Sequence, residues 1–419
     1  ETASRFPVRM MESGPAAGAL VASYYADRLG LNRLMSFDMG GTTAKACLIE
    51  DRKPLVTGLF EVDRMYRFKS GSGMPVIIPA IDMIEVGAGG GSIASIDSLG
   101  LLKVGPRSAG SEPGPACYGL GGKSPAVTDA DVLIGILDPD NFLGGEMQLD
   151  KNAAETAIQP LADQLNTSVQ KAARGIFQVV NESMAAAARA HATDRGIDYR
   201  GIPVLAFGGA GPVHACHVAE LLESTRVIYP PLASVLSAFG TLVTPLRFDL
   251  ARGTRGGIDL ASAARIYSDM VTEAGAALES AGAPAGVIRY VYGADMRYVG
   301  QQNEVTVSFA ADPSADYEID DMREAFETAY EVQYGLRLPD IPIEVVAWRI
   351  SAHGPPVERH GAPELTDVVG VPKGHREVLI GDKPELVAVY DRFSIAARQQ
   401  IQGPVIIEER ETTIFVLPK

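Results

Sequence analysis

The feature that most constrains this fold is a short glycine turn between two strand-like runs. Residues 35–38 end an apolar run, Gly40 and Gly41 follow at once, and residues 45–50 resume strand character. A strand, a tight glycine turn and a second strand form a β-hairpin. Its turn can approach a ligand closely, because glycine carries no side chain. The sequence therefore predicts a hairpin with an open turn.

The residues around this turn are those of a phosphate site. Asp38 ends the first strand, and Thr42 and Thr43 follow the glycines. Glycines expose backbone N–H groups, threonines add hydroxyl donors, and an aspartate can hold a hydrated Mg²⁺ beside phosphates. A plain hairpin turn with a capping aspartate is the alternative. The motif is neither a Walker loop nor a GxGxxG loop.

Two further glycine runs have a ligand-binding and an ordinary interpretation. Residues 204–207 form a buried-strand run, which stops at Gly208–Pro212 before a predicted helix at 214–222. In such an arrangement the N–H groups of the helix N-terminus can meet an anion, but a simple strand-to-helix turn looks the same. Gly87–Gly91 either allows close backbone approach or forms a common turn.

Acidic residues open a predicted helix at 128–137. Asp129 and Asp131 are candidate metal ligands or catalytic carboxylates, and helix capping is their ordinary role. Thr128 or Asp129 would be the N-cap of this helix. Before it, residues 105–122 hold too many glycines and prolines for any regular element.

Histidines offer a weaker metal hypothesis. His214 and His217 are three residues apart, so they share a helix face and could hold a metal ion. A surface or packing role is the alternative, because no third ligand stands nearby. His191 is assigned a structural role.

Composition excludes several classes of protein. The net charge of −15 and the pI of about 4.9 argue against nucleic-acid binding and against docking on anionic lipid. No apolar run reaches the roughly 18 residues of a membrane span. Cys47, Cys117 and Cys216 lie far apart, so no disulfide framework is expected and a reducing cytoplasm fits best. The first residue is Glu1, and we expect a fragment or a processed chain.

Periodicity divides the 419 residues into an α/β part and strand-rich parts. Helices are predicted at 14–30, 150–165, 168–192, 259–282 and 320–334, and antiparallel strands at 287–309. Strands dominate from residue 343 onward. With boundaries near 250–258 and 352–362, the predicted parts are 1–255, 256–352 and 353–419.

Taken together, the ordered motifs resemble the hydantoinase A/5-oxoprolinase family, which includes N-methylhydantoinases and an acetone carboxylase subunit. The resemblance covers nearly the whole chain. The motifs are ESGPAAG at 12–18, FDMGGTTAK at 37–45, VGAGGGSIA at 86–94, VGPRSAGSEPGPACYG at 104–119, VTDADVLIG at 127–135, DPDNFLGG at 138–145 and LAFGGAGPVHAC at 205–216. The resemblance continues through residues 294–307 and 403–418.

The resemblance implies an actin-like ATPase (ribonuclease H-like) lobe, a smaller α+β region and a β-rich C-terminal part. Family members grip ATP with two glycine hairpins, and this chain carries the one that looks like the second. We expect the N-terminal part with the first hairpin to be lacking from this sequence. Phosphates and Mg²⁺ would contact Asp38, Gly40, Gly41, Thr42 and Thr43. Relatives often end this hairpin in Asp where this chain has Lys45, which would pair with a phosphate oxygen.

The same resemblance implies further site residues and a partner. Gly208, Gly209, Gly211 and Pro212 would border the adenosine, and Asp129 would position Mg²⁺ or water. The implied activity is ATP-dependent opening of a small cyclic imide or lactam through phosphorylation of its amide oxygen, together with a hydantoinase B-like subunit. A self-sufficient homodimer is the alternative to that partner. Activation of a ketone or bicarbonate for a carboxylase, and a non-catalytic fragment, are the alternative functions.

Overall fold

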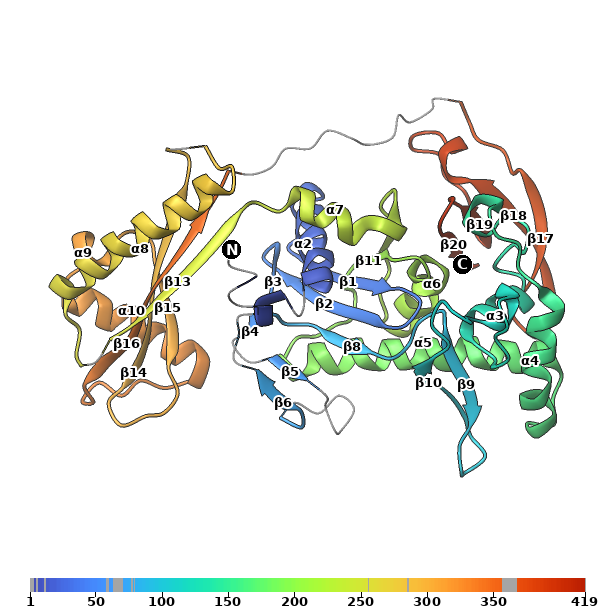
Figure 1. The fold of residues 1–419 in the computed structure, drawn as a ribbon, viewed down its shortest axis with the longest axis horizontal. Coiled ribbons are helices and arrows are strands. Elements are labelled where there is room, and N and C mark those ends of the chain that lie inside the picture. Colours follow the sequence, from blue (N-terminus) through green and yellow to red (C-terminus); the bar gives the residue numbers. More distant parts are fainter. Residues whose placement is uncertain are drawn as a thin grey trace. The chain divides into compact units, whose positions relative to one another are not determined.

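The computed structural model describes residues 4, 7–10, 13–57, 60–62, 71–76, 78, 80–254, 256–284, 286–355 and 368–418. Glu12 and much of the predicted 352–362 boundary lie outside them. The chain divides into two compact units (Figure 1). Unit 1 consists of Glu1–Leu242 and His360–Lys419, and unit 2 of Val243–Arg359.

The core of unit 1 is a mixed six-stranded sheet, which confirms the α/β class. Its order is β12-β11-β1-β2-β3, and β8 pairs with β2. β11 runs parallel to β1 and β12, whereas β2 is antiparallel to β1. The strands are β1 (Arg33–Met39), β2 (Ala44–Glu50), β3 (Lys53–Pro54), β8 (Ile84–Val86), β11 (Val204–Phe207) and β12 (Val227–Ile228). Every residue of β11 is buried, as expected of a strand covered on both faces.

Helices cover this sheet. Figure 1 shows α2 (Ser13–Arg28) on one side of β1 and β2 and the long α5 (Val169–Asp194) on the other. α6 (Gly211–Leu221) packs beside α5 and against β1 and β11. α3 (Val127–Leu133) and α4 (Lys151–Gln164) pack on α5. The predicted helices therefore form, with ends within three residues except at 128–137.

Two local predictions are wrong. The predicted helix at 128–137 spans only Val127–Leu133 and its N-cap is Ala126, because Asp129 is the third helical residue and its carboxylate accepts the Ala126 N–H. The loop expected at 105–122 begins with strand: β10 (Leu102–Ser108) pairs with β9 (Ser92–Ile96), and an irregularity between Val104 and Ser108 accommodates the glycine and the proline.

The C-terminal strands form a second sheet of unit 1. Its order is β17-β18-β19-β20, with bounds Gly374–Leu379, Pro384–Asp391, Val405–Glu408 and Thr413–Val416. Ile406 and Phe415 belong to the same apolar cluster as Phe37 and Phe177. The C-terminal segment therefore shares the core of the α/β lobe.

Unit 2 is an antiparallel sheet covered by helices. The order is β13-β16-β14-β15, with bounds Arg247–Gly253, Ile343–His353, Arg289–Tyr298 and Val305–Phe309. Tyr267 of α8 (Leu260–Ser280) and Phe326 of α10 (Ile319–Tyr334) meet Trp348 of the sheet in one apolar cluster. Unit 2 thus has a core of its own.

Shorter elements complete the described chain. They are β4 (Val56–Thr57), β5 (Phe60–Val62), β6 (Met74–Val76), β7 (Ala80–Ile81), α7 (Leu236–Val243), α9 (Pro313–Asp316) and the 3₁₀ turns at Pro7–Met10, Ala116–Tyr118, Phe142–Gly145, Ala233–Val235 and Arg392–Ser394. Among the described residues, every helix is too short or too polar to cross a membrane.

Candidate functional site

The predicted glycine hairpin forms at the end of β1. Met39 pairs with Ala44 across the hairpin, and the Gly40 N–H donates to the carbonyl oxygen of Thr43 at 3.1 Å. Gly41 is exposed, and its N–H has no hydrogen-bond partner among the described residues. The turn therefore presents an unused donor.

The second glycine loop lies directly beside this hairpin. Because β11 is parallel to β1 and Asp38 pairs with Phe207, both loops leave the same edge of the sheet. The Ala210 N–H donates to the carbonyl oxygen of Met39 at 3.0 Å. At Gly208 φ is +87°, and an added Cβ would overlap the Met39 carbonyl and lie 2.7 Å from Asp38 Oδ1. Only glycine allows the two loops to approach this closely.

The third glycine run, Gly87–Gly91, holds the hairpin turn through backbone hydrogen bonds. Gly90 and Gly91 donate their N–H groups to the carbonyl oxygens of Gly40 and Gly41, at 3.0 and 2.6 Å. A Cβ on Gly89 would lie 2.6 Å from the Gly41 carbonyl carbon. The run therefore fixes the turn through backbone contacts.

These loops border one cavity of about 200 Å³. That is below the roughly 300–1,000 Å³ of pockets for drug-sized ligands, so the cavity accommodates a small ring or a phosphate group. Its wall consists of loop backbone, of α3 side chains and of two segments at 137–143 and 408–413. The lining residues are Gly40, Gly41, Gly90, Tyr118, Thr128, Asp131, Leu137, Asp138, Asn141, Phe142, Leu143, Gly209, Ala210, Val213, Glu408, Glu409, Arg410, Glu411, Thr412 and Thr413.

Asp38 and Lys45 flank the hairpin turn and each has a protein partner. Asp38 Oδ2 accepts the hydroxyl of Ser237 at 3.0 Å. Burial raises the pKa of Asp38, while Ser237 and Lys45 oppose that shift. Lys45 Nζ donates to Thr43 Oγ1 at 2.7 Å and pairs with Glu85 at 3.2 Å. Lys45 thus orients a turn hydroxyl from within the sheet.

Asp129 is buried and holds the preceding loop in place. Its carboxylate accepts the N–H groups of Ala116, Cys117 and Ala126 at 3.2, 2.7 and 2.8 Å. Burial raises the pKa of Asp129, and these bonds oppose the shift. The structure brings the hairpin and the 208–212 loop together but places Asp129 behind the cavity wall.

Asp131 lies two residues after Asp129 on α3, and unlike Asp129 it lines the cavity. It is 2% exposed, and its Oδ1 has no hydrogen-bond partner among the described residues. Oδ2 lies 3.4 Å from Nε2 of His214, which is fully buried. Nδ1 of His214 lies 3.0 Å from Oδ1 of Asn181 on α5. A chain of three polar side chains therefore leads from the cavity into the helical layer.

The HxxH pair packs on an aromatic ring. The rings of His214 and His217 both have their centroids 4.8 Å from that of Phe177, one stacked and one edge-on. Within the described residues, no cluster of three or more His, Cys, Asp or Glu side chains could hold a metal ion. Both histidines thus make the packing contacts of the alternative to a metal site.

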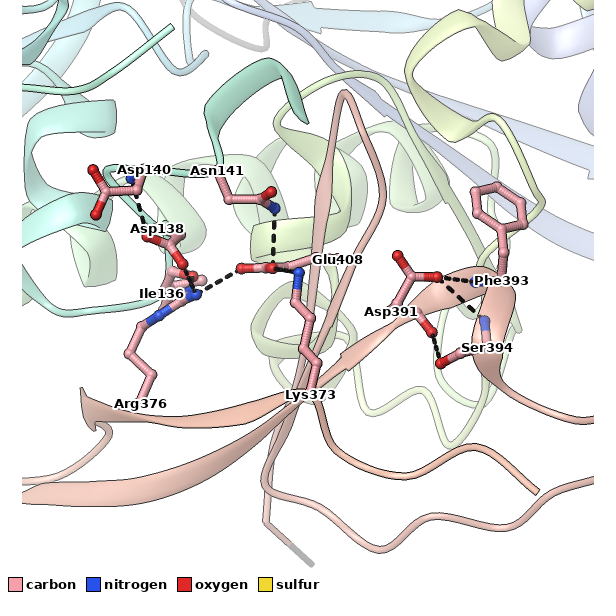
Figure 2. Close-up of polar contacts among 10 residues, drawn as sticks. All are labelled: Ile136, Asp138, Asp140, Asn141, Lys373, Arg376, Asp391, Phe393, Ser394 and Glu408. Carbon is pink, nitrogen blue, oxygen red and sulfur yellow. Dashed lines mark hydrogen bonds and ion pairs between the residues drawn. The ribbon is translucent and has the colours of Figure 1, made fainter. Parts of the chain in front are cut away.

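An ion-pair network around the buried Glu408 joins the C-terminal sheet to the cavity wall. Figure 2 shows Arg376 and Lys373 converging on Glu408, whose carboxylate they approach to 2.7 and 2.5 Å. Arg376 also pairs with Asp138 at 2.6 Å, and Asn141 donates to Glu408 at 3.0 Å. The network fixes the segments at 138–141 and 408 relative to each other.

Sequence reasoning missed part of this site. Asn181 and Glu408 carried no local signal, because each acts with residues far away in the chain. Thr412 donates to the carbonyl oxygen of Gly209 at 2.9 Å, and this link between the C-terminal sheet and the second glycine loop was not predicted.

The sequence is similar to proteins of one known family over nearly its whole length. A family model described as Hydantoinase/oxoprolinase matches residues 1–250, and one described as Hydantoinase/oxoprolinase C-terminal domain matches residues 259–419. The caprolactamase subunit alpha of Pseudomonas jessenii is 33% identical over 98% of this chain and 60% of its own length. The acetophenone carboxylase gamma subunit of Aromatoleum aromaticum is 30% identical over 98% of this chain and 58% of its own.

Two solved structures share the fold. A nucleotide-free acetone carboxylase gives a TM-score of 0.81 at 26% identity, covering 97% of this chain and 58% of the other. The ATP-dependent caprolactamase from Pseudomonas jessenii gives 0.73 at 32%, covering 97% and 59%. The chain thus spans about three fifths of the length of these relatives, and its fold is theirs.

Proposed function

The chain belongs to the hydantoinase/oxoprolinase family, and on that premise we propose that it is the nucleotide-binding subunit of an ATP-dependent enzyme that opens a small cyclic amide of the hydantoin or 5-oxoproline type. ATP supplies the phosphoryl group that activates the amide oxygen. A hydantoinase B-like subunit, fused or separate, is the proposed partner.

One observation carries this proposal: two glycine loops leave adjacent parallel strands and border the same cavity. Gly41 and Gly209 each have a backbone N–H without a partner among the described residues. α6 begins at Gly211, just after Gly209, and the dipole at its N-terminus favours an anion. This donor set suits phosphate oxygens.

Roles follow for the residues around the loops. Gly40, Gly41, Thr42 and Thr43 would contact phosphates. The loop of Gly208, Gly209, Gly211 and Pro212 would border the nucleotide on the other side. Those are the proposed cofactor-binding residues.

Three charged residues act around that donor set. Lys45 acts through Thr43, whose hydroxyl it holds. Asp129 acts by holding the loop at 116–126 rather than by touching the ligand. Asp38 keeps one carboxylate oxygen free of Ser237, and that oxygen suits a water of a hydrated Mg²⁺. Mg²⁺ would neutralise phosphate charge there.

The chemistry explains why ATP is needed. An amide resists hydrolysis because resonance stabilises it, and a five-membered ring adds little strain. When the amide oxygen attacks the terminal phosphorus, a new O–P bond forms and the bond to ADP breaks. Water then adds to the activated carbon, and the ring C–N bond breaks as the nitrogen takes up a proton. A second water hydrolyses the resulting acyl phosphate to a carboxylate and inorganic phosphate. The backbone donors are suited to hold the phosphoryl group in line for the first step.

Calorimetric titration of the protein with Mg·ATP tests the proposal. Binding at micromolar to millimolar nucleotide is expected. In a full-length subunit, Asp38→Ala should lower ring-dependent ADP formation by at least about 100-fold. Unchanged turnover would remove the assignment of Asp38. Absence of binding, restored by adding the N-terminal part, would favour a non-catalytic fragment.

A second candidate is the activating subunit of an ATP-dependent carboxylase, which would phosphorylate a ketone or bicarbonate. The similarity to acetophenone carboxylase and the TM-score of 0.81 with acetone carboxylase favour it. Incubation of the full complex with labelled bicarbonate and a ketone, and separately with a cyclic amide, discriminates the two. Fixed label supports the carboxylase, and ring opening supports the hydrolase.

A further inference from the structure

We propose that Asp131 recognises the N–H group of the ring that receives the phosphoryl group, so that the site selects cyclic amides with an unsubstituted nitrogen. This inference rests on the proposed function. It adds a specificity-determining residue that neither the motif at 38–45 nor the loop at 208–212 contains.

The first argument is the unused oxygen of Asp131. The side chain is 2% exposed and lines the cavity, yet Oδ1 has no partner among the described residues. A buried carboxylate oxygen without a hydrogen bond is costly, so such an atom is suited to a partner that the chain itself does not supply. An acceptor in this position calls for a donor.

His214 settles which oxygen is left for the ligand. Nε2 of His214 lies 3.4 Å from Oδ2, whereas Oδ1 stays unused. Nε2 itself forms no hydrogen bond, so the two side chains are in close contact without a bond between them. Oδ2 is thus the oxygen next to His214, and Oδ1 is the one left for a ligand.

The second argument is the complementarity of the cavity to a cyclic amide. Its volume of about 200 Å³ suits a small ring. Gly41 and Gly209 supply donors on the same cavity in which Asp131 supplies an acceptor. A cyclic secondary amide presents its carbonyl oxygen and its N–H on neighbouring atoms. With N–H on Asp131, the carbonyl oxygen would face the phosphoryl group that the glycine loops hold.

The test compares two rings in the full-length protein with its partner subunit. ADP formation is measured with 2-pyrrolidone, the five-membered lactam ring of 5-oxoproline, and with its N-methyl derivative. Sites that hydrogen-bond a substrate N–H reject analogues lacking it strongly, so the wild type should prefer the N–H ring by about 100-fold or more in kcat/KM. Equal rates with both rings in the wild type would overturn the inference without any variant.

The second part of the test uses the variant Asp131→Asn in the same assay. The asparagine keeps the shape of the side chain but replaces the carboxylate with a neutral amide, whose oxygen is a weaker acceptor for the ring N–H. We expect kcat/KM for the N–H ring to fall by about 10- to 100-fold, with the N-methyl ring nearly unaffected and Mg·ATP affinity unchanged. An equal fall for both rings, or a tenfold loss of Mg·ATP affinity without any ring, would assign Asp131 to stability or to the nucleotide and overturn the inference.

The outcomes separate the two proposals. If neither ring stimulates ADP formation and Mg·ATP does not bind, the proposed function fails. If both rings stimulate ADP formation equally, the proposed function stands and only the role of Asp131 fails.

Discussion

At the residue scale, Gly208 shows how closely the two ligand loops approach. Its φ of +87° and the Met39 carbonyl both exclude a side chain. Gly196 also has a positive φ, +69°, but nothing lies within 4 Å of its Cβ position. An alanine at Gly196 would suffer backbone strain alone, whereas an alanine at Gly208 would also overlap neighbouring atoms.

We expect Gly196→Ala to cost about 1 kcal/mol, the usual penalty of an L-residue in the left-handed region. Gly208→Ala should cost roughly 1–2 kcal/mol more, because a loop must also move. Urea unfolding followed by circular dichroism measures both values. Equal costs would contradict the close approach of the loops.

The lowered pKa of His217 should make the free energy of unfolding depend on pH. Burial lowers the pKa of His217 to about 4, and His214 and Arg174 add to the shift. The unfolded chain binds this proton from about pH 6.5 downward, so stability is full above pH 6.5 and is lost as the pH falls toward 4. The loss at pH 5 should reach about 2 kcal/mol.

His217→Gln tests that dependence. The variant should show a smaller loss of unfolding free energy between pH 7 and pH 5 than the wild type, measured by urea denaturation at both values. A wild-type curve that is flat over this range would contradict a buried neutral imidazole at position 217.

At the element scale, α2 and α7 cross at small residues. A Cβ on Gly240 of α7 would lie 2.8 Å from the carbonyl carbon of Ala17 in α2. Gly14, also in α2, has nothing within 4 Å of its Cβ position. Both glycines are helical, so propensity favours alanine at each and only packing distinguishes them.

Opposite signs are therefore expected for two similar substitutions. Gly14→Ala should leave the free energy of unfolding unchanged or raise it by about 0.5 kcal/mol. Gly240→Ala should lower it by roughly 2 kcal/mol, since two packed helices must separate. Thermal and urea unfolding provide the measurement, and a neutral Gly240→Ala would argue against this crossing.

The sequence predicts elements whose signal is local. The hairpin at 38–45 and the strand, loop and helix at 204–222 were visible because glycines, apolar runs and caps lie within a few residues of one another. Asp129 was misassigned as an N-cap candidate because the backbone of Ala126 opens the helix without a capping side chain. Local pattern cannot show which of several acids turns toward a cavity.

Long-range pairing stayed invisible for a physical reason. Arg376 and Glu408 meet Asp138 only after strands far apart in the chain are brought together. A charge in a strand sequence usually indicates a solvated face. Glu408 is instead 1% exposed, and its burial depends on cations that tertiary structure supplies.

At the scale of the whole molecule, the two units have separate cores, and the chain's single tryptophan lies in one of them. Trp348 of β16 is 1% exposed, and its ring lies edge-on to that of Tyr267 of α8. Tryptophan fluorescence therefore reports on unit 2 alone. It gives no signal from the cavity of unit 1.

We expect residues 243–355, produced alone, to fold and to show the blue-shifted emission of a buried tryptophan. The reason is that their apolar cluster is built from unit 2 residues only. Emission spectra before and after urea measure this. A red-shifted spectrum in buffer would show that the core of unit 2 does not form by itself.

The cavity wall at 408–413 has a consequence for biosynthesis. A ribosome makes the glycine hairpin and the loop at 208–212 well before Glu408 and Thr412, and unit 2 is translated in between. Thr412 then hydrogen-bonds Gly209, some two hundred positions earlier in the order of synthesis. A nascent chain stalled before that stretch would display both loops with one wall missing, so the cavity closes only when translation of this region is complete.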